Sequence, residues 1–465
     1  MSSVITRFAP SPSGFLHIGS VRTALINYLF VKKSKKEFKD SKFLLRIEDT
    51  DKERSENKYF ESIINGLKWL NINWEEEIYI QSKNINLHKN IAEDLLNNKK
   101  AFKCICTKEQ LDKKREKYVK ERKNIKRLCT TCENNIDIQS LKKDYCVRMS
   151  IPNNGSIVID DLVQGKVEVL NSEIDNFIIL RRDSTPTYML SVVVDDNKMG
   201  ITHIIRGDDH LNNAFKQFHI YNSLNWKIPK FVHIPLMHGN DGSKLSKRHG
   251  SMDIIEFKNN GYLANSIVNY LLTLGIYSSK NEIFSIDSII KDFELSKINK
   301  SPSKFDYEKL NFINLNYIKN LNNNDVINLF KNDYNFDATN FDTNLITKAL
   351  DILKNRSNTL LNLKDNILPF LIAKNLKRNK NDVSEESIIL LKKYKDIIDK
   401  ENEWEKEKIE RITKEFTNNE NIKFNEIGEP IRLILTGKSK GIPISDILII
   451  LGKKETLERI NNFFI

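Results

Sequence analysis

The chain of 465 residues carries a net charge of +12 and is 40% hydrophobic, which favours about three domains in an ordinary soluble protein. The basic excess favours a polyanionic partner, although a composition rich in Lys and Asn would produce the same charge. No signal peptide opens the chain and no apolar run reaches membrane-spanning length, so we expect a cytoplasmic protein, and its five cysteines are not expected to form disulfides.

The first stretch, from Arg7 to Ser20, predicts a strand, a tight turn and the start of a helix. Residues 4–9 are mostly apolar, as in a short parallel strand, and the prolines that follow end it. Apolar residues recur at helical spacing from Ile18 onwards. The free N–H groups of a helix that follows a strand favour phosphate, Gly19 lets a ligand approach the backbone, and His17 offers a donor. A purely structural role for His17 is the alternative.

A second predicted strand, residues 43–47, ends in polar residues. Acidic groups at the carboxyl end of a parallel strand lie beside the ligand crevice of an open α/β sheet. We therefore expect Glu48 to contact a substrate, and either Asp49 or Thr50 to cap the helix expected near residues 53–70. The chain has no Gly-x-Gly-x-x-Gly motif, which disfavours an ordinary dinucleotide site.

Four cysteines form two close pairs that are separated by 22 residues, 107 to 128. Two such pairs suit a tetrahedral zinc site, in which a metal stabilises a small module without a core of its own. The candidate ligands are Cys104, Cys106, Cys129 and Cys132. The alternative is four unrelated buried thiols, and we assign the fifth cysteine, Cys146, to the core.

Residues 175–250 return to short apolar segments, each followed by polar residues. The segments 177–180, 203–207 and 231–237 predict strands, 189–194 predicts a strand or another apolar segment, and 211–221 predicts a helix. The last strand leads into a glycine-framed loop in which Lys244 and Lys247 suit a polyphosphate, unless they belong to a solvated basic turn.

The remainder of the chain predicts helices. Residues 251–325 contain helical segments with basic joints, and residues 326–465 lack strand-like alternation. Helical periodicity recurs at 341–355, 384–399, 401–416 and 444–463, so we expect an all-helical C-terminal domain.

Four of these stretches together resemble the bacterial type of glutamyl-tRNA synthetase, a class I aminoacyl-tRNA synthetase. They are Arg7–Ser20 with its His-Ile-Gly-Ser, Arg46–Asp51, Arg206–His210, and Lys244–Gly250 with its Lys-Leu-Ser-Lys-Arg. The match keeps the family's order over residues 4–305 and weakens towards the end of the chain. Leu245, Arg248 and Ser20 depart from the general class pattern in ways that the glutamyl family tolerates.

The resemblance implies an α/β fold, with a doubly wound Rossmann-like catalytic core, an inserted acceptor-binding domain and an all-helical anticodon-binding domain. The implied domains are the first half of the core at 1–100, the insertion with its zinc candidate at 101–185, the second half of the core at 186–250, a stem-contact helical region at 251–325 and the anticodon-binding domain at 326–465.

The resemblance also implies a reaction. L-Glutamate is joined to ATP as glutamyl-adenylate and then transferred to the 3′ end of tRNA(Glu), with tRNA needed for the first step. An enzyme that charges tRNA(Gln) as well, or mainly, is one alternative, and a non-catalytic tRNA-binding paralogue is another. A truncated relative that modifies a tRNA base is a third alternative, which the presence of residues 326–465 disfavours. We expect a monomer with no membrane partner.

Site residues are implied by the same motifs. The catalytic set is His17, Gly19, Lys244 and Lys247; Ser20, Asp209, His210 and Ser246 complete the ATP site; and Arg7, Ala9, Ser11, Glu48, Tyr188 and Arg206 form the glutamate site. Mg²⁺ would share the charge of the phosphates, and the four cysteines would hold one structural Zn²⁺, as some family members do. Val192 stands where some relatives carry a polar residue. The run Lys113–Arg127, with nine basic and two acidic residues, would contact the acceptor stem, and Arg356 is a candidate anticodon reader.

Overall fold

The computed structural model describes residues 3–51, 54–121, 129, 131–239, 241–243, 253–277, 282–284, 286–337, 340–372 and 383–464. The chain divides into two compact units. The N-terminal unit comprises Met1–Glu256 and Val268–Asp306, and the C-terminal unit comprises Phe257–Ile267 and Tyr307–Ile465. Among the helices that the structure describes, none combines the length and the apolar content that crossing a bilayer requires.

Parallel strands form the centre of the N-terminal unit. Strands β1 (Ile5–Phe8), β2 (Lys42–Ile47) and β3 (Tyr79–Ile80) form one parallel sheet, and β9 (His203–Gly207) pairs with β10 (Lys230–Ile234) in a second. The backbone N–H of Thr202, just before β9, donates to the carbonyl of Ile5 at 2.9 Å, so β9 begins beside β1. Because these strands are covered on both faces, their sequences are nearly continuous apolar runs, and the strand predictions for residues 4–9, 43–47 and 203–207 are confirmed.

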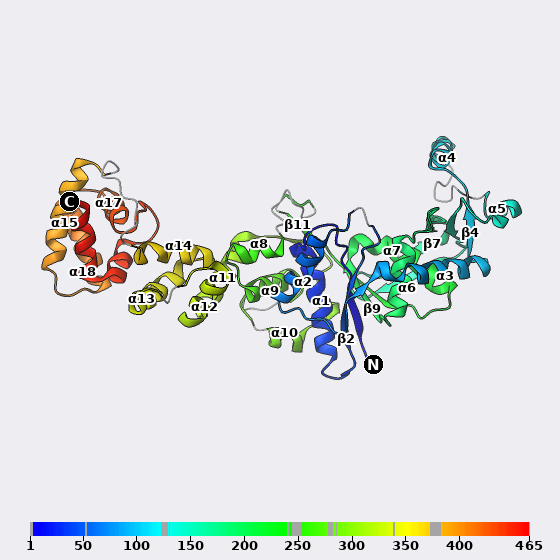
Figure 1. Ribbon diagram of the computed structural model, residues 1–465, viewed down its shortest axis with the longest axis horizontal. Helices are drawn as coiled ribbons and strands as arrows, with labels where there is room; N and C mark the ends of the chain where they lie inside the picture. The colour runs from blue at the N-terminus through cyan, green and yellow to red at the C-terminus, as the bar shows by residue number, and fades with distance from the viewer. Residues whose placement is uncertain are drawn as a thin grey trace. The chain divides into compact units, whose positions relative to one another are not determined.

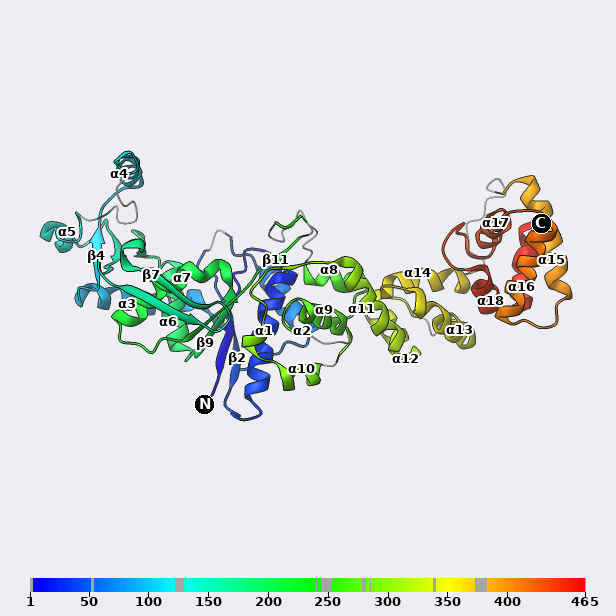
Figure 2. The same ribbon diagram turned by 180° about the vertical axis from the view of Figure 1, so that it is seen from behind.

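Helices cover these strands. They are α1 (Ile18–Ser34), α2 (Asn57–Trp69), α3 (Ile85–Asn97), α6 (Tyr188–Lys198) and α7 (Leu211–Ser223). In both views α6 and α7 lie next to each other beside β9 (Figures 1 and 2). The helix expected from Ile18 is confirmed, as is the helix expected at 211–221.

Two local predictions are wrong. Residues 189–194 form an apolar segment, as expected, but the strand alternative is wrong because they belong to the helix α6; a short apolar run that is buried on all sides does not reveal its period. Neither Asp49 nor Thr50 caps a helix, since α2 begins only at Asn57. The carboxylate of Asp49 instead accepts hydrogen bonds from the backbone N–H and the hydroxyl of Ser82, at 2.8 and 2.6 Å.

Antiparallel strands follow β3 in the sequence and precede β9, and they form a separate layer. Strands β4 (Ala101–Cys104), β5 (Cys146–Met149) and β8 (Ile178–Leu180) form an antiparallel sheet, and β6 (Ser156–Asp161) with β7 (Gly165–Leu170) forms a hairpin. The helices α4 (Lys108–Lys120) and α5 (Ile136–Ser140) lie between β4 and β5 in the sequence. Further along the chain come β11 (Met237–His238), α8 (Ile254–Asn259), α9 (Ala264–Thr273), α10 (Ile286–Asp292) and β12 (Ser303–Lys304).

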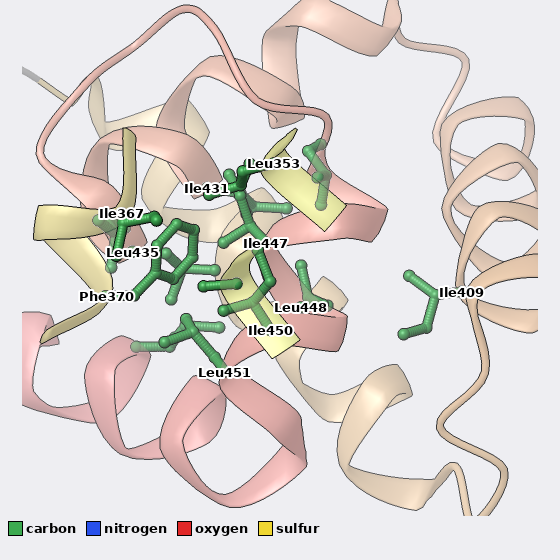
Figure 3. Packing of buried hydrophobic residues seen from close by; sticks show 14 of the residues in the cluster. Leu353, Ile367, Phe370, Ile409, Ile431, Leu435, Ile447, Leu448, Ile450 and Leu451 are labelled. Atoms are coloured by element: carbon green, nitrogen blue, oxygen red, sulfur yellow. The ribbon is translucent and has the colours of Figure 1, made fainter. Parts of the chain in front are cut away.

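The C-terminal unit is helical throughout its described residues, as expected for 326–465. Its helices after residue 306 are α11 (Tyr307–Asn320), α12 (Asn323–Tyr334), α13 (Thr343–Leu353), α14 (Leu360–Leu371), α15 (Glu385–Lys400), α16 (Lys406–Asn419), α17 (Phe424–Thr436) and α18 (Ile444–Phe464). Gly437 ends α17 in the left-handed conformation, with φ 74°, that glycine adopts without strain. Aliphatic side chains of α14, α17 and α18 interdigitate in its core, including Ile367, Ile431, Leu435 and Ile447 (Figure 3).

Truncation of this core should unfold the C-terminal unit more readily. Ile431 is fully buried, so Ile431→Ala should lower the free energy of unfolding by about 2–5 kcal/mol through lost burial and the cavity left behind. The matched control is Ile389→Ala on α15, where the side chain is 58% exposed and the change should stay within about 0.5 kcal/mol. Urea unfolding followed by helical circular dichroism measures both, and equal losses in the two variants would contradict the assigned core.

Candidate active site

A pocket of about 540 Å³ lies at the carboxyl ends of the parallel strands in the N-terminal unit. It collects residues from the turn after β1, the end of β2, the start of α6, the end of β9 and the segment after β10. Eleven of the predicted site residues line it: Arg7, Ala9, Ser11, His17, Gly19, Ser20, Glu48, Tyr188, Arg206, Asp209 and His210. Residues that are up to about 200 positions apart in the sequence therefore face one cavity, as expected for the ligand crevice of an open α/β sheet.

The amino end of α1 opens one side of this pocket. His17 is the N-cap of the helix, and its Nδ1 accepts a hydrogen bond from the backbone N–H of Ser20 at 3.2 Å. The hydroxyl of Ser20 lies 2.9 Å from the other ring nitrogen, Nε2. A Cβ at Gly19 would come within 3.1 Å of this imidazole, so the glycine lets the ring pack against the first turn. The helix dipole favours an anion in this position.

A buried ion-pair network forms the floor behind the pocket. The carboxylate of Asp196, on α6, accepts from Arg7 Nε at 2.9 Å and from Arg7 Nη2 at 3.2 Å. The same carboxylate accepts from Arg46 Nη1 at 2.6 Å, and Arg46 Nη2 also lies 3.1 Å from Glu48 Oε1. Asp196 therefore joins β1 and β2 to α6 and compensates the charge of Arg7, which lines the pocket.

Charges in this network are held ionised by one another. Burial alone would raise the pKa of Asp196, but Arg46 and Arg7 outweigh burial and lower it below its ordinary value. Burial would likewise lower the pKa of Arg46, and the carboxylates of Asp196 and Glu48 raise it instead. Glu48 is the carboxylate of the network that is least firmly held in its ionised form, because burial raises its pKa despite the neighbouring arginines.

Arg206 differs from Arg7 in having no acidic partner within the described ranges. Arg206 is 6% exposed as a residue, and the hydrogen bonds of its guanidinium go to the imidazole of His233 at 3.1 Å, the hydroxyl of Tyr188 at 3.4 Å and the carbonyl of His210 at 3.3 Å. Among the described residues no carboxylate forms an ion pair with it. Burial accordingly lowers the pKa of Arg206. A buried cation that lines a cavity without a counter-ion is suited to an anionic ligand.

The polar groups beside Arg206 are positioned by one another. The hydroxyl of Tyr188 lies 3.3 Å from Nδ1 of His210, and burial raises the pKa of that phenol. Burial and the nearby Arg206 lower the pKa of His210, which favours the neutral imidazole. Asp209 is partly exposed at the rim, with a carboxylate oxygen 3.9 Å from Nε2 of His210.

Sequence reasoning missed several buried polar residues that support the site. Asp196 follows the apolar segment 189–194, and the signal that could have found it is a carboxylate beside a run that must be buried and hence paired. Arg22, on α1, donates to the carbonyls of Pro235 and Leu274 at 2.7 and 2.9 Å, and burial lowers its pKa to about 10. The partner of Arg206, His233, carries no local signal in the sequence. Lys244, Ser246 and Lys247 lie outside the described residues.

The two cysteine pairs lie close together beside the antiparallel layer, and none of the four cysteines lines this pocket. The Sγ atoms of Cys104, Cys106, Cys129 and Cys132 all lie within 4.8 Å of one another. Such spacing suits tetrahedral thiolate coordination, in which Zn–S bonds of about 2.3 Å place the sulfurs roughly 3.8 Å apart. Cys146 lies beside them in the same apolar cluster, with its thiol 3.4 Å from the carbonyl of Cys104, as expected for a core residue.

Comparison with known proteins adds independent findings. Residues 3–312 match the family described as "tRNA synthetases class I (E and Q), catalytic domain", and residues 324–464 match an anticodon binding domain. "Glutamate--tRNA ligase 2" of Rickettsia felis is 40% identical over 469 residues, and "Glutamate--tRNA ligase 1" of Rickettsia canadensis is 41% identical over 467; each alignment covers 99% of both chains. The crystal structure of a glutamate tRNA ligase from Elizabethkingia meningosepticum, in complex with its amino acid, superposes with a TM-score of 0.80 at 26% identity over 99% of both chains.

Loss of the Asp196 charge should destabilise the N-terminal unit. In Asp196→Asn two buried arginines lose their shared counter-ion, which should cost about 3–5 kcal/mol at neutral pH. Because the pKa of Asp196 is depressed, its contribution is present above the ordinary carboxyl value of 3.8 and is lost as the pH falls through the lower folded value. Urea midpoints of wild type and variant should therefore differ at pH 7 and converge towards pH 3.

The control for this experiment is Asp94→Asn on α3, where the side chain is exposed and the midpoint should not move. Equal midpoints for wild type and Asp196→Asn at pH 7 would contradict the ion-pair network.

Proposed function

Because the chain belongs to the class I tRNA synthetases for glutamate and glutamine, we infer that it is an enzyme that attaches L-glutamate to tRNA in an ATP-dependent reaction. The relatives named glutamate–tRNA ligase match over 99% of their own length. In the structure, the observation that best supports glutamate as the amino acid is the buried guanidinium of Arg206, which faces the pocket and has no carboxylate partner in the described part of the chain.

We propose that the side-chain carboxylate of glutamate binds Arg206. An Arg offers two parallel N–H groups to a carboxylate, and the contacts of Nη1 and Nη2 of Arg206 with described residues are long and go to neutral groups. Arg7 adds a second guanidinium, but Asp196 already compensates its charge. Arg7 is therefore suited to orienting the substrate through hydrogen bonds more than to adding net positive charge. Glu48 and the hydroxyl of Tyr188 are then the groups suited to the ammonium of the substrate, with Ala9 and Ser11 lining the same wall.

Activation joins the α-carboxylate of glutamate to the α-phosphate of ATP and releases pyrophosphate. The protein contributes by positioning the reactants and by stabilising negative charge on the phosphates. We propose that His17 and the N–H groups that open α1 face the α-phosphate, with Gly19 and Ser20 beside them, and that Asp209 and His210 lie near the nucleoside. Lys244, Ser246 and Lys247 would bind the outer phosphates, and Mg²⁺, when bound with ATP, shares their charge. For the transfer step we assign no side-chain base.

Two surfaces are proposed to contact tRNA. None of the residues of α4 is buried, and its basic side chains are suited to the phosphates of the acceptor stem. In the anticodon-binding domain, Arg356 remains the candidate reader. Its side chain is 48% exposed, and its Nε lies 3.0 Å from the buried carboxylate of Asp446, which fixes the direction of the guanidinium. We propose tRNA(Glu) as the substrate tRNA.

An ATP–pyrophosphate exchange assay tests the enzymatic function directly. Glutamate should support exchange in the presence of tRNA, and purified tRNA(Glu) should accept glutamate under the same conditions. Purified tRNA(Gln), assayed beside it, measures whether the enzyme discriminates between the two. If the folded protein shows no glutamate-dependent exchange with or without tRNA, the proposed function is wrong.

Arg206→Gln should weaken glutamate binding in this assay. The variant keeps a polar side chain but removes the charge, so the KM for glutamate should rise by about 10- to 100-fold while the KM for ATP changes little. Arg54→Gln, at a site where the side chain is 77% exposed, is the control and should retain wild-type constants. An unchanged KM for glutamate in Arg206→Gln would remove Arg206 from the substrate site.

One structural Zn²⁺ is proposed at the four cysteines, because four converging thiols are the donor set that zinc prefers. Metal analysis of protein purified under reducing conditions should find about one equivalent of zinc. Cys129→Ser should lower this content, whereas Cys146→Ser should retain it because Cys146 lies outside the set of four. Zinc-free wild-type protein with normal stability would exclude the metal site.

A further inference from the structure

A buried aspartate–histidine pair lies directly behind Arg206. His233, on β10, is fully buried, and the parallel register of β9 and β10 makes it the partner of Arg206 on the neighbouring strand. Arg206 Nε donates to His233 Nε2 at 3.1 Å, and His233 Nδ1 lies 2.7 Å from a carboxylate oxygen of Asp161. Asp161 is 2% exposed and ends strand β6, so a residue of the antiparallel hairpin contacts β10 at the residue that pairs with Arg206.

These contacts assign the tautomer of His233. The Nε of an arginine always carries a hydrogen, so His233 Nε2 can only accept, and the ring proton must therefore sit on Nδ1 and point at Asp161. Burial lowers the pKa of His233, which agrees with a neutral ring. A protonated ring would instead direct an N–H from Nε2 at the N–H of Arg206, and the contact would be lost.

Asp161 is itself held firmly. One carboxylate oxygen accepts from the backbone N–H groups of Val163 and Gln164 at 2.9 and 2.8 Å, and the other accepts from the backbone N–H of His233 at 3.0 Å. Burial alone would raise the pKa of Asp161, but the hydrogen bond with the His233 ring and those from the backbone of Gln164 and Val163 outweigh burial and lower it, so the carboxylate stays ionised. The amide of Gln164 also donates to the carbonyl of His233 at 3.0 Å, which fastens the loop between β6 and β7 to β10.

We propose that His233, oriented by Asp161, is a positioning residue that aims Arg206 at the side-chain carboxylate of glutamate. The inference rests on the proposed function and deepens it. A neutral imidazole fixes the guanidinium at Nε and leaves Nη1 and Nη2 for the substrate, while the positive charge of Arg206 stays uncompensated. A carboxylate in the place of His233 would hold the guanidinium equally well but would compete with the substrate for its charge.

Two substitutions at His233 separate this role from a merely structural one. In His233→Asn the amide nitrogen can replace Nδ1 and keep the bond to Asp161, but nothing replaces the acceptor for Arg206. In His233→Gln the amide oxygen can reach the place of Nε2 and keep that acceptor. We expect the KM for glutamate to rise about 10-fold or more in His233→Asn, with kcat and the KM for ATP nearly unchanged, and to return close to wild type in His233→Gln.

Asp161→Asn tests the same hydrogen-bonded chain of Asp161, His233 and Arg206 at its other end. When the amide oxygen keeps the backbone N–H groups of Val163 and Gln164, the amide nitrogen faces His233 Nδ1 and forces the ring proton onto Nε2, towards Arg206. The KM for glutamate should rise as in His233→Asn, and the double variant should be no worse than either single one. The control is His203→Asn, at the far end of β9 from Arg206, which should keep the wild-type KM.

The outcomes are distinguishable. Glutamate-dependent exchange that is absent from wild type contradicts the proposed function itself. With an active wild type, an unchanged KM for glutamate in both His233→Asn and Asp161→Asn overturns the positioning role, as does a parallel loss of kcat and thermal stability in all His233 variants without rescue by glutamine. If His233→Asn does not fold, an unchanged KM in Asp161→Asn alone overturns it.

Discussion

The site depends on a difference between two buried arginines, Arg7 and Arg206, in whether a carboxylate compensates their charge. Arg7 shares the carboxylate of Asp196 with Arg46, and all three groups are almost completely removed from water. Removing such charges from water is costly unless each finds a close partner, so the ends of β1 and β2 and the last turn of α6 are fixed relative to one another by this one carboxylate. Arg206 has no acidic partner among the residues that the structure describes, and its charge is therefore available to a ligand.

This inequality connects the fold to the proposed chemistry. Open α/β sheets gather ligands at the carboxyl ends of their strands, and here β1, β2 and β9 deliver Arg7, Glu48 and Arg206 to one pocket. The amino end of α1 faces the same cavity and favours phosphate. An amino acid with an anionic side chain and a nucleotide can therefore be held side by side, which is what the activation of glutamate requires.

The sequence revealed the parts of the site that are encoded locally. The strand from residue 4, the helix from Ile18 and the polar strand ends each have a pattern of apolar residues and turns, and the motif resemblance brought together eleven residues that line one pocket. The sequence did not predict the supporting residues because their partners are distant in the chain. Arg7 and Asp196 are 189 residues apart, and Asp161 and His233 are 72 apart, so no local periodicity links them. The helix α6 was missed for a related reason, since complete burial removes the alternation that distinguishes a strand from a helix.

A crystal structure with a non-hydrolysable glutamyl-adenylate analogue tests the central claim most directly. The account predicts that the side-chain carboxylate of the analogue lies within about 3 Å of the terminal nitrogens of Arg206, that Asp196 still holds Arg7, and that the phosphate lies at the amino end of α1. An analogue bound with its carboxylate away from Arg206, or with its phosphate remote from His17, would contradict the account.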